Sequence, residues 1–350
     1  MRINFSPTVA RDLAQNSDNR CSFPNCPAIT AGPSDKSTAA TARTGMACHI
    51  IPASAGKNAL RQDPTYPRAK IGTAENGVWM CYTHGKLIDA DEARYTAEML
   101  RIWRKVNERR VQIRHETGKE VGLGDFRLAD IKLAKGSVAI TCHENENALI
   151  GELLNDCALP LIWGCQLAGN VRDVLIEITR NAFVHGGAVR VEVVVSSNQV
   201  SITDNGSPFD PSALLRTATG RGGQHAMRSI LRFGQTNAIA AYRRRGTVNE
   251  FSIGRPIHQE DVKAFTLCAV EHATVDYRSL KADPVISTCG IVYILIPRFW
   301  CRSDAYRWPK DLLENLYPWQ QVVFIADDVT EETLSILKER VPNCEIVRLR

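Results

Sequence analysis

The chain has 350 residues, of which 44% are hydrophobic, and its 43 Lys and Arg exceed its 38 Asp and Glu by five. This length and composition allow two or three domains with substantial cores. No apolar run approaches the length of a membrane span and the N-terminus has no apolar signal region, so we expect a cytoplasmic protein without a membrane partner.

Positive charge is concentrated in the first third of the chain. Residues 1–120 hold 18 Lys and Arg against 12 Asp and Glu, a net charge of +6, whereas residues 121–350 have a net charge of −1. A protein that contacts the phosphate backbone of DNA needs such an excess. The alternative is a solvated basic helix over residues 101–110, which would need no partner.

Two pairs of metal-ligating residues lie in this basic region. Cys21 and Cys26 are separated by four residues, and Cys81 and His84 follow after a long gap, separated by two. Either spacing can place two ligands on one tetrahedral ion, and a structural zinc site takes four Cys or His ligands. The sequence therefore predicts one structural Zn²⁺ held by all four residues.

Further residues between and after these pairs form a wider pattern. His49 stands in the segment Cys-His-Ile-Ile-Pro, Asn76 lies five residues before Cys81, and a helix rich in aromatic residues comes after them. Over residues 18–108 the pattern resembles the HNH endonucleases, whose ββα-metal unit is often stapled by zinc, and most of all the nuclease of bacterial antiphage effectors. The resemblance implies that His49 is the general base, that Asn76 fixes the loop and orients His49, and that one catalytic Mg²⁺ or Mn²⁺ is bound.

Two positions depart from the HNH pattern. Many HNH enzymes have an acidic residue where this chain has Cys48, and a His where it has Gly85. Both are common metal-ligand positions, so the ligands of the catalytic ion stay open, with Asp63, Asp89 or Asp91 as substitutes. In the alternative interpretation His49 is a buried, hydrogen-bonded residue of a DNA-binding module derived from a nuclease.

A glycine-rich segment separates the HNH-like unit from the rest of the chain. The long helix is expected to end near His115, and residues 118–124 contain three glycines, which is typical of a linker. We therefore place a first domain at residues 1–120. A strand over residues 135–142 and a helix over residues 145–157 are expected to open the second.

The central region carries a second group of polar residues. Glu177, Asn181 and His185 are spaced to share one face of a helix, whose adjoining side is apolar. Alternating valines from 189 to 195 predict a strand, and a turn at residues 197–198 leads into another that ends at Asp204, followed two residues later by Gly206. Two carboxylates and an amide then meet at one end of a sheet, which we interpret as an ATP site.

Chemical roles can be assigned to these residues. Glu177 is suited to deprotonate a water, Asn181 to contribute an oxygen to the Mg²⁺ of the nucleotide, and Asp204 to accept a hydrogen bond from an exocyclic amine of the base. A glycine-rich stretch before a predicted helix over residues 224–231 could bind phosphates through its N–H groups. Its glycines are Gly220, Gly222 and Gly223.

These motifs resemble the GHKL ATPases, with Glu177 and Asn181 as the N box, Asp204 to Gly206 as the first glycine box, and residues 220–223 as the mobile phosphate lid. The strand that closes the family's domain is expected at residues 290–297, with the Gly246-Thr247 pair as a rival. The resemblance implies a GHKL α/β sandwich over residues 121–300.

The last part of the chain predicts a small βαβ-like appendage over residues 301–350. It comprises a strand at residues 321–326, a helix at 331–340 and a strand at 344–349. The eleven cysteines have irregular spacing and predict no disulfide framework, so Cys157, Cys165, Cys268 and Cys289 are expected to be reduced core thiols. The fold class expected for the whole chain is α+β multidomain.

Two functions are consistent with this organisation. The first is an ATP-regulated, metal-dependent DNA endonuclease, a bacterial antiphage defence effector that acts as a homodimer or higher oligomer with a protein partner from the same defence locus. The second is a nucleotide-sensing DNA-binding or signalling protein whose HNH unit is inactive. Cys48 and Gly85 favour the second, whereas His49 and Asn76 together favour the first.

Overall fold

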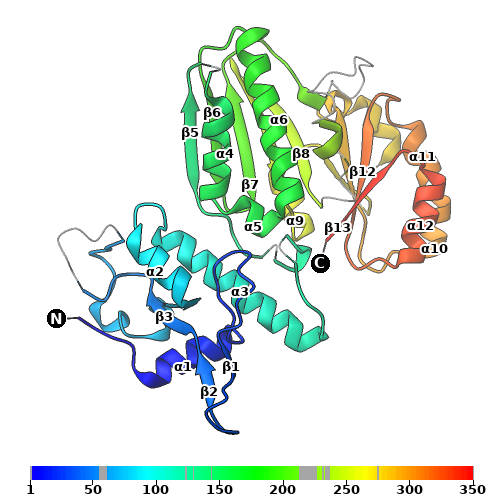
Figure 1. Cartoon of the computed structure of the whole chain (residues 1–350). Helices are drawn as coiled ribbons and strands as arrows, with labels where there is room; N and C mark the ends of the chain where they lie inside the picture. Colours follow the sequence, from blue (N-terminus) through cyan, green and yellow to red (C-terminus); the bar gives the residue numbers. More distant parts are fainter. Residues whose placement is uncertain are drawn as a thin grey trace. The chain divides into compact units, whose positions relative to one another are not determined.

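The computed structural model describes residues 2–54, 61–122, 124–128, 130–142, 144–212, 227–230, 232, 237–273 and 276–349. It divides the chain into two compact units, residues 1–134 and 135–350, each of which we describe by itself (Figure 1). Both units mix helices and strands, as expected for an α+β multidomain chain. The domain boundaries predicted after residues 120 and 300 both need correction.

The first unit is built on a two-stranded antiparallel hairpin that is followed directly by a helix. In the hairpin Cys48 lies opposite Val78 and His49 opposite Gly77. A second, smaller antiparallel hairpin is formed between residues 31 and 43. The elements are α1 (Pro7–Asn16), β1 (Ala31–Pro33), β2 (Thr41–Arg43), β3 (Gly45–His49), β4 (Gly77–Cys81), α2 (Tyr82–Ala90) and α3 (Ala97–Thr117).

The long helix α3 covers this hairpin and supplies much of the core of the first unit. Its Leu100, Trp103 and Val106 are buried, and the helix contacts β4. Thr96 caps its first turn by accepting a hydrogen bond from the Met99 N–H, and Gly118 ends it in the left-handed conformation that favours glycine. The helix thus runs to the place where the sequence predicts its end.

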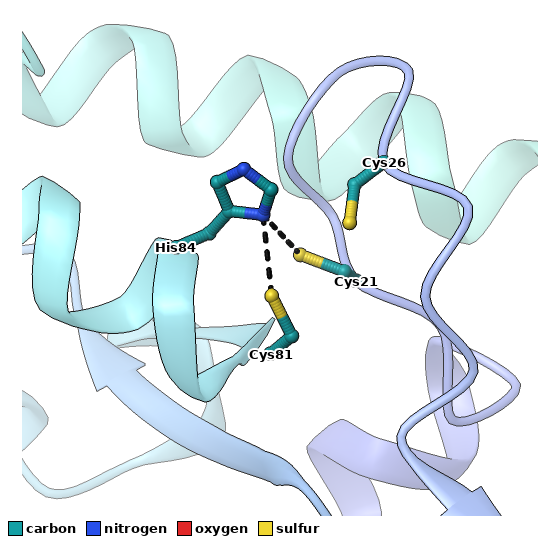
Figure 2. Close-up of side chains that lie close together, drawn as sticks. All are labelled: Cys21, Cys26, Cys81 and His84. Atoms are coloured by element: carbon teal, nitrogen blue, oxygen red, sulfur yellow. Dashed lines mark hydrogen bonds between the residues drawn. The ribbon is translucent and has the colours of Figure 1, made fainter.

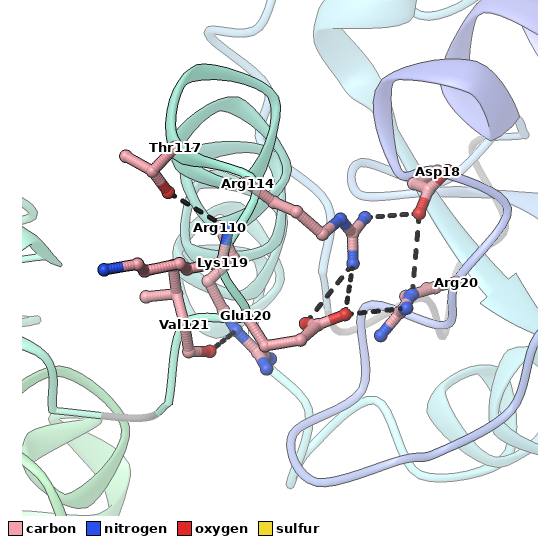
Figure 3. Close-up of polar contacts among 8 residues, drawn as sticks. All are labelled: Asp18, Arg20, Arg110, Arg114, Thr117, Lys119, Glu120 and Val121. Atoms are coloured by element: carbon pink, nitrogen blue, oxygen red, sulfur yellow. Dashed lines mark hydrogen bonds and ion pairs between the residues drawn. The ribbon is translucent and has the colours of Figure 1, made fainter.

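The segment after α3 folds back onto the first unit instead of leaving it as a free linker (Figure 3). Arg114 binds the carboxylates of both Asp18 and Glu120, and Glu120 also accepts from Arg20 at 3.0 Å. Arg110 donates to the carbonyl of Val121, whose side chain is buried. The first boundary is therefore at residue 134, because these contacts attach residues 120–121 to the first unit.

The second unit begins with a five-stranded antiparallel sheet in the order β5-β6-β7-β9-β8. Helices α4 and α6 pack against each other beside this sheet, as Figure 1 shows, and the strands and helices predicted between residues 135 and 204 are confirmed. The elements are β5 (Gly136–Ile140), α4 (Glu146–Asp156), α5 (Leu159–Trp163), α6 (Cys165–Val184), β6 (Val191–Ser196), β7 (Gln199–Asp204), β8 (Ile239–Arg245), β9 (Val248–Gly254) and α9 (Gln259–Phe265).

A four-stranded parallel sheet completes the second unit. Its strands follow the chain order β10-β11-β12-β13, and three helices in mutual contact lie beside it (Figure 1). The elements are β10 (Ala269–Glu271), β11 (Ile291–Leu295), α10 (Arg302–Arg307), α11 (Pro309–Glu314), β12 (Gln321–Ala326), α12 (Glu331–Arg340) and β13 (Glu345–Arg348). The strand, helix and strand predicted after residue 320 are confirmed.

The predicted boundary at residue 300 falls inside this parallel sheet. Strand β11 precedes the boundary and its neighbour β12 comes after it, and five residue pairs align between them. Residues 301–350 are therefore no separate appendage, because β12 and β13 continue a sheet that starts with β10. Strand β11 is also not part of the antiparallel sheet. The last strand of that sheet in chain order is β9, which comes after the rival Gly246-Thr247 pair.

One tyrosine links the two sheets of the second unit. The fully buried Tyr293 of β11 donates its hydroxyl hydrogen to the carbonyl of Ala240 at 2.6 Å and accepts from the N–H of the same residue at 2.8 Å. Ala240 lies on β8. The single hydroxyl of Tyr293 thus satisfies both the N–H and the carbonyl of this residue. The contact fixes the parallel sheet against an outer strand of the antiparallel one.

The cysteines of the second unit differ from the prediction. Cys268 and Cys289 form a disulfide, although the sequence predicts two reduced core thiols. They lie just before β10 and β11, which are neighbours in the parallel sheet, and this pairing could not be read from residues 21 positions apart. Cys165 is a reduced thiol but exposed, whereas Cys157 is a reduced and buried thiol as expected.

Among the described residues, no helix is both long enough and apolar enough to cross a lipid bilayer.

Candidate functional site

Four side chains of the first unit converge on one point (Figure 2). Their ligand atoms, the sulfurs of Cys21, Cys26 and Cys81 and a ring nitrogen of His84, all lie within 4.8 Å of one another. Nδ1 of His84 is 3.6 Å from the sulfur of Cys21 and 3.2 Å from that of Cys81. Two ligands of a tetrahedral zinc are about 3.6 Å apart, so the cluster could hold a metal ion.

The local fold explains why these four residues meet. Cys81 ends β4 and His84 lies in the first turn of α2, so the direct passage from strand to helix brings the two together. Cys21 and Cys26 come from the loop after α1, where Phe23 stacks on the ring of His84 with 3.9 Å between ring centroids. Phe23 also contacts Trp103 of α3, and this aromatic packing holds the loop in place.

His49 lies at the end of β3, half-buried beneath the N-terminal segment. Phe5 stacks on its ring at 3.8 Å between centroids. Nε2 of His49 is buried and has no hydrogen-bond partner among the described residues, so the hydrogen bond with the backbone of Ile3 involves Nδ1. Burial lowers the pKa of His49, and the neutral ring with its proton on Nδ1 leaves Nε2 able to accept a proton.

Asn76 fastens the loops around His49, and its side-chain hydrogen bonds go to Ile51 and Ile71. Its side-chain oxygen accepts from the Ile51 N–H at 2.8 Å, and its amide donates to the carbonyls of Ile51 and Ile71 at 2.9 and 3.0 Å. Only 1% of Asn76 is exposed. The predicted loop-fixing contacts are therefore present, and any effect on the orientation of His49 passes through the backbone.

The two positions that depart from the HNH pattern face each other. A Cβ atom on Gly85 would stand 2.6 Å from the sulfur of Met46 and 2.9 Å from that of Cys48, so a side chain there would require these two side chains to shift. Cys48 is 2% exposed, and burial raises the pKa of its thiol to about 12. Together the three residues form an apolar contact that offers no ligand to a divalent ion such as Mg²⁺.

The three candidate carboxylates have different surroundings. Asp63 accepts from Thr65 in its own turn, and Asp91 accepts from the N–H of Arg94. Asp89 binds the guanidinium of the buried Arg61 at 2.7 Å. Burial lowers the pKa of His49 and raises that of Cys48, and the charge of Asp89 opposes the first shift and adds to the second. Asp89 is thus the one of the three whose charge reaches His49.

Much of the basic charge of α3 is engaged within the first unit. Arg104 donates to the carbonyls of Ala74 and Gly77 on either side of Asn76, and Arg109 pairs with Asp130. Arg101 and Lys105 form no hydrogen bond or ion pair with the described residues. The positive charge available to a nucleic acid is therefore smaller than the composition alone indicates.

In the second unit, Glu177 and Asn181 lie on α6 as predicted, but His185 does not. The helix ends at Val184, and His185 is its exposed capping residue. The carboxylate of Glu177 lies 3.8 Å from Arg180, and Asn181 is half-buried. The predicted face of the helix therefore carries two of the three residues.

The end of β7 lies next to the end of α6. The N–H of Ser207 donates to the carbonyl of Gly186 at 2.8 Å, and that carbonyl would be only 2.9 Å from a Cβ on Gly206. Glycine is needed at 206 because of this close approach. The loops after the helix and the strand are thereby joined, and they bring the half-buried Asp204 to the helix end that carries Asn181.

A residue that the sequence analysis did not identify completes this site. Asn249 of β9 lies opposite Asp204 in the strand register and donates to its Oδ1 at 2.8 Å. It is 4% exposed, and its own oxygen accepts from Arg244 at 2.6 Å and from the Tyr242 hydroxyl at 2.9 Å. No sequence signal marks Asn249, since only the pairing of β7 with β9 brings it to Asp204.

The predicted phosphate-binding glycines Gly220, Gly222 and Gly223 lie outside the described residues. Of the helix predicted after them, residues 227–230 are described and are helical.

Comparison of the sequence with protein-family models and with curated proteins gives no match.

Proposed function

We propose that this protein is an ATP-regulated, metal-dependent DNA endonuclease whose cutting unit is residues 1–134. The observation that carries the proposal is the arrangement of His49 and Asn76 on a hairpin followed directly by a helix. Nε2 of His49 is buried and has no hydrogen-bond partner among the described residues, while Asn76 holds the surrounding loops by three hydrogen bonds to the backbone. A base held neutral by burial, on a rigid support, is what hydrolysis of a phosphodiester requires.

The metal cluster is proposed to be a structural zinc site. Three Cys and one His form a closed tetrahedral set, which zinc prefers over harder ions. Such a site would join the loop after α1 to the junction of β4 and α2. Its role is to support the fold, because all four positions are occupied by protein and none is left for a substrate.

In the proposed reaction Nε2 of His49 takes a proton from the attacking water. The apolar contact of Met46, Cys48 and Gly85 does not fit a divalent ion. Of the candidate carboxylates, Asp89, which is paired with Arg61, is the one whose charge reaches His49, and the ion is proposed to bind there. A Mg²⁺ or Mn²⁺ bound there would stabilise charge on the leaving oxygen. Mg²⁺ commonly takes one or two protein carboxylates and completes its shell with water and phosphate oxygens.

The second unit is proposed to bind ATP with Mg²⁺. Asp204 would accept from the exocyclic amine of adenine, Asn181 would contribute to the Mg²⁺ shell, and Glu177 would activate the hydrolytic water. The glycines at 220, 222 and 223 would enclose the phosphates. Nucleotide state would then control pairing of two chains, and two single-site nucleases brought together could cut both DNA strands.

A second candidate function is a nucleotide-sensing DNA-binding protein without nuclease activity. The packing of Met46 and Cys48 against Gly85 favours it, since this contact occupies positions where HNH enzymes commonly carry metal ligands. In either case a cytoplasmic role in antiphage defence, with a protein partner from the same locus, is proposed from the resemblance to bacterial effectors.

Plasmid cleavage distinguishes the two candidates. Purified protein is incubated with supercoiled plasmid, Mg²⁺ or Mn²⁺, and ATP or no nucleotide. We expect nicking that His49→Ala abolishes while DNA affinity and zinc content are unchanged, and that the control His115→Ala, an exposed residue of α3, leaves intact. If the wild type cuts no nucleic acid with either metal, or His49→Ala cuts as fast as the wild type, the endonuclease proposal is wrong.

Nucleotide binding is tested separately by calorimetry. Asp204→Ala and Asn181→Ala should lose ATP affinity, whereas Glu177→Gln should bind ATP and fail to hydrolyse it, because only the base is removed. Asp173→Ala, an exposed residue on the same helix, is the matched control. Normal ATP affinity in Asp204→Ala would show that the base pocket lies elsewhere.

A further inference from the structure

One of the two carboxylate oxygens of Asp204 already accepts hydrogen bonds from the protein. Its Oδ1 accepts from the N–H of Gly206 at 2.8 Å and from the amide of Asn249 at 2.8 Å. Its Oδ2 has no hydrogen-bond partner among the described residues. Since a carboxylate otherwise offers two oxygens to a ligand, this geometry leaves one acceptor oxygen for recognition.

The orientation of the Asn249 amide is fixed by what surrounds it. Arg244 can only donate, so the atom of Asn249 that it binds must be the oxygen. The nitrogen then faces acceptors on the other side, the carboxylate of Asp204 and the carbonyl of Ser207 at 2.9 Å. Asn249 cannot rotate to release Oδ1 without losing all of these bonds.

Arg244 supports the same turn from the other side. It donates to the carbonyl of Gly206 at 3.3 Å as well as to Asn249. The carboxylate, the turn that comes after it and the amide are therefore held as one unit by β8 and β9, strands that lie far from Asp204 in the sequence. The conformation of the turn after Asp204 is thus fixed by contacts within the protein.

From this arrangement we propose that Asn249 makes the site selective for adenine over guanine by restricting Asp204 to a single acceptor oxygen. The inference rests on the proposed ATP site and deepens it. The 6-amino group of adenine needs one acceptor, which Oδ2 supplies. Guanine presents a 6-oxygen there, which would face Oδ2 without a hydrogen between them, and buried mismatches of this kind are strongly rejected.

Guanine has a second way to bind a carboxylate, and Asn249 blocks it. The paired N–H groups at positions 1 and 2 of guanine need both carboxylate oxygens in one plane. Oδ1 is occupied, so only one of these two bonds could form. Asn249 is thus a positioning residue that acts on the base through Asp204, and its removal should relax selectivity and not merely weaken binding.

The test compares ATP and GTP binding by calorimetry in the wild type, Asn249→Ala and Ser252→Ala. Ser252 is a matched control, because it is a buried polar residue of β9 that also bonds a β7 side chain, Gln199, at 3.1 Å. We expect the wild type to prefer ATP by roughly 100-fold or more, and Asn249→Ala to reduce that ratio by about tenfold. Ser252→Ala should keep the wild-type ratio even if its melting temperature falls.

The outcomes separate this inference from the proposed function. An unchanged ratio in Asn249→Ala, or equal wild-type affinity for the two nucleotides, overturns the role of Asn249 and leaves the nucleotide site standing. A wild type that binds neither nucleotide overturns the ATP site and this inference together. An equal loss of selectivity in Ser252→Ala would show that general loosening of the β7–β9 pair, and not Asn249, is responsible.

Discussion

The two units of this chain hold their functional side chains in place by different means. In the first, the central sheet has only two strands, and side chains bonded to backbone carry much of the order: Asn76 to two loops, Arg61 to the carbonyl of Ile88, and Arg104 to the carbonyls beside Asn76. In the second, sheets of five and four strands bury apolar side chains, including Val193, Ile202 and Val323.

The difference reflects the amount of apolar surface that each architecture can bury. A two-stranded hairpin is marginally stable in water, so the first unit needs cross-links between its loops. The buried Asn76 provides some of them, and the proposed zinc on Cys21, Cys26, Cys81 and His84 would provide others. The second unit can rely on its sheets, and its polar residues are free to form a site at their edge. The two units should therefore respond differently to the same perturbation.

Loss of the metal should have the largest effect and should be confined to the first unit. Zinc binding in small zinc domains contributes on the order of 10 kcal/mol to folding. A chelator, or Cys81→Ser, should therefore unfold residues 2–134 and leave residues 135–349 folded. Hydrogen exchange with mass spectrometry measures both. Cys344→Ala, a buried thiol of the second unit outside the cluster, is the control, and full protection of the first unit after zinc removal would contradict the prediction.

Asn76→Ala should be the next most damaging change. It leaves two buried backbone groups of Ile51 and a partly buried carbonyl of Ile71 without the Asn76 side chain, and the cost should be about 2–4 kcal/mol of unfolding free energy. Chemical denaturation of the wild type and the variant, followed by fluorescence of Trp79 and Trp103, gives the value. A loss below about 0.5 kcal/mol would mean that these loops are held by other contacts.

Tyr293→Phe should cost less, about 1–3 kcal/mol, and only in the second unit. The ring is kept, but the N–H and carbonyl of Ala240 lose the hydroxyl that satisfies both. Thermal unfolding should shift for residues 135–349 while the first unit melts as in the wild type. Equal shifts in both units would show that their stabilities are coupled.

Lowering the pH should have the smallest effect on stability. Each unit carries a half-buried histidine whose protonation is linked to folding. Burial lowers the pKa of His49 and of His272 from the ordinary value of 6.5, so the folded protein resists protonation more than the unfolded chain does. Both contribute their full stability above about pH 6.5 and lose it as pH falls toward the lowered folded value, by about 1.4 kcal/mol for each unit of pKa shift.

Replacing His49 by Asn should flatten the pH dependence of the first unit alone, and replacing His272 should do so for the second. Unfolding free energies measured from about pH 7.5 to about 5.5, a range that spans the ordinary histidine pKa, test this. A pH dependence that neither substitution alters would assign the effect to other groups.

The local sequence pattern was sufficient to predict elements whose structure depends on residues close together in the sequence. The alternation of valines before residue 196 predicts β6, and the cap before Glu331 predicts α12. The cluster of Cys21, Cys26, Cys81 and His84, which could hold a metal ion, was also predicted from the spacing within each pair. The strand, the helix and each ligand pair are features of a few residues of chain, whereas the meeting of the two pairs depends on the fold.

The sequence pattern did not predict which strands pair when the strands are distant in the sequence. Strand β11 reads as an ordinary apolar strand, and nothing in its residues says that it pairs with β12 across residue 300 and not with the antiparallel sheet. Asn249 is an ordinary polar residue until β9 aligns with β7. Gly85 and Cys48 each look like a lost ligand, and only the fold shows that they pack against one another.

The hydrogen bonds between Tyr293 and Ala240 also bear on how this protein avoids edge-to-edge strand pairing with other copies of itself. Strand β8 ends the antiparallel sheet, and its outward N–H and carbonyl groups would accept a strand from another molecule. At Ala240 one hydroxyl occupies both groups, so a foreign strand has no place to begin pairing there. Loss of that hydroxyl would expose the position, and the protein would then be prone to aggregate through β8 at concentrations where the wild type stays dispersed.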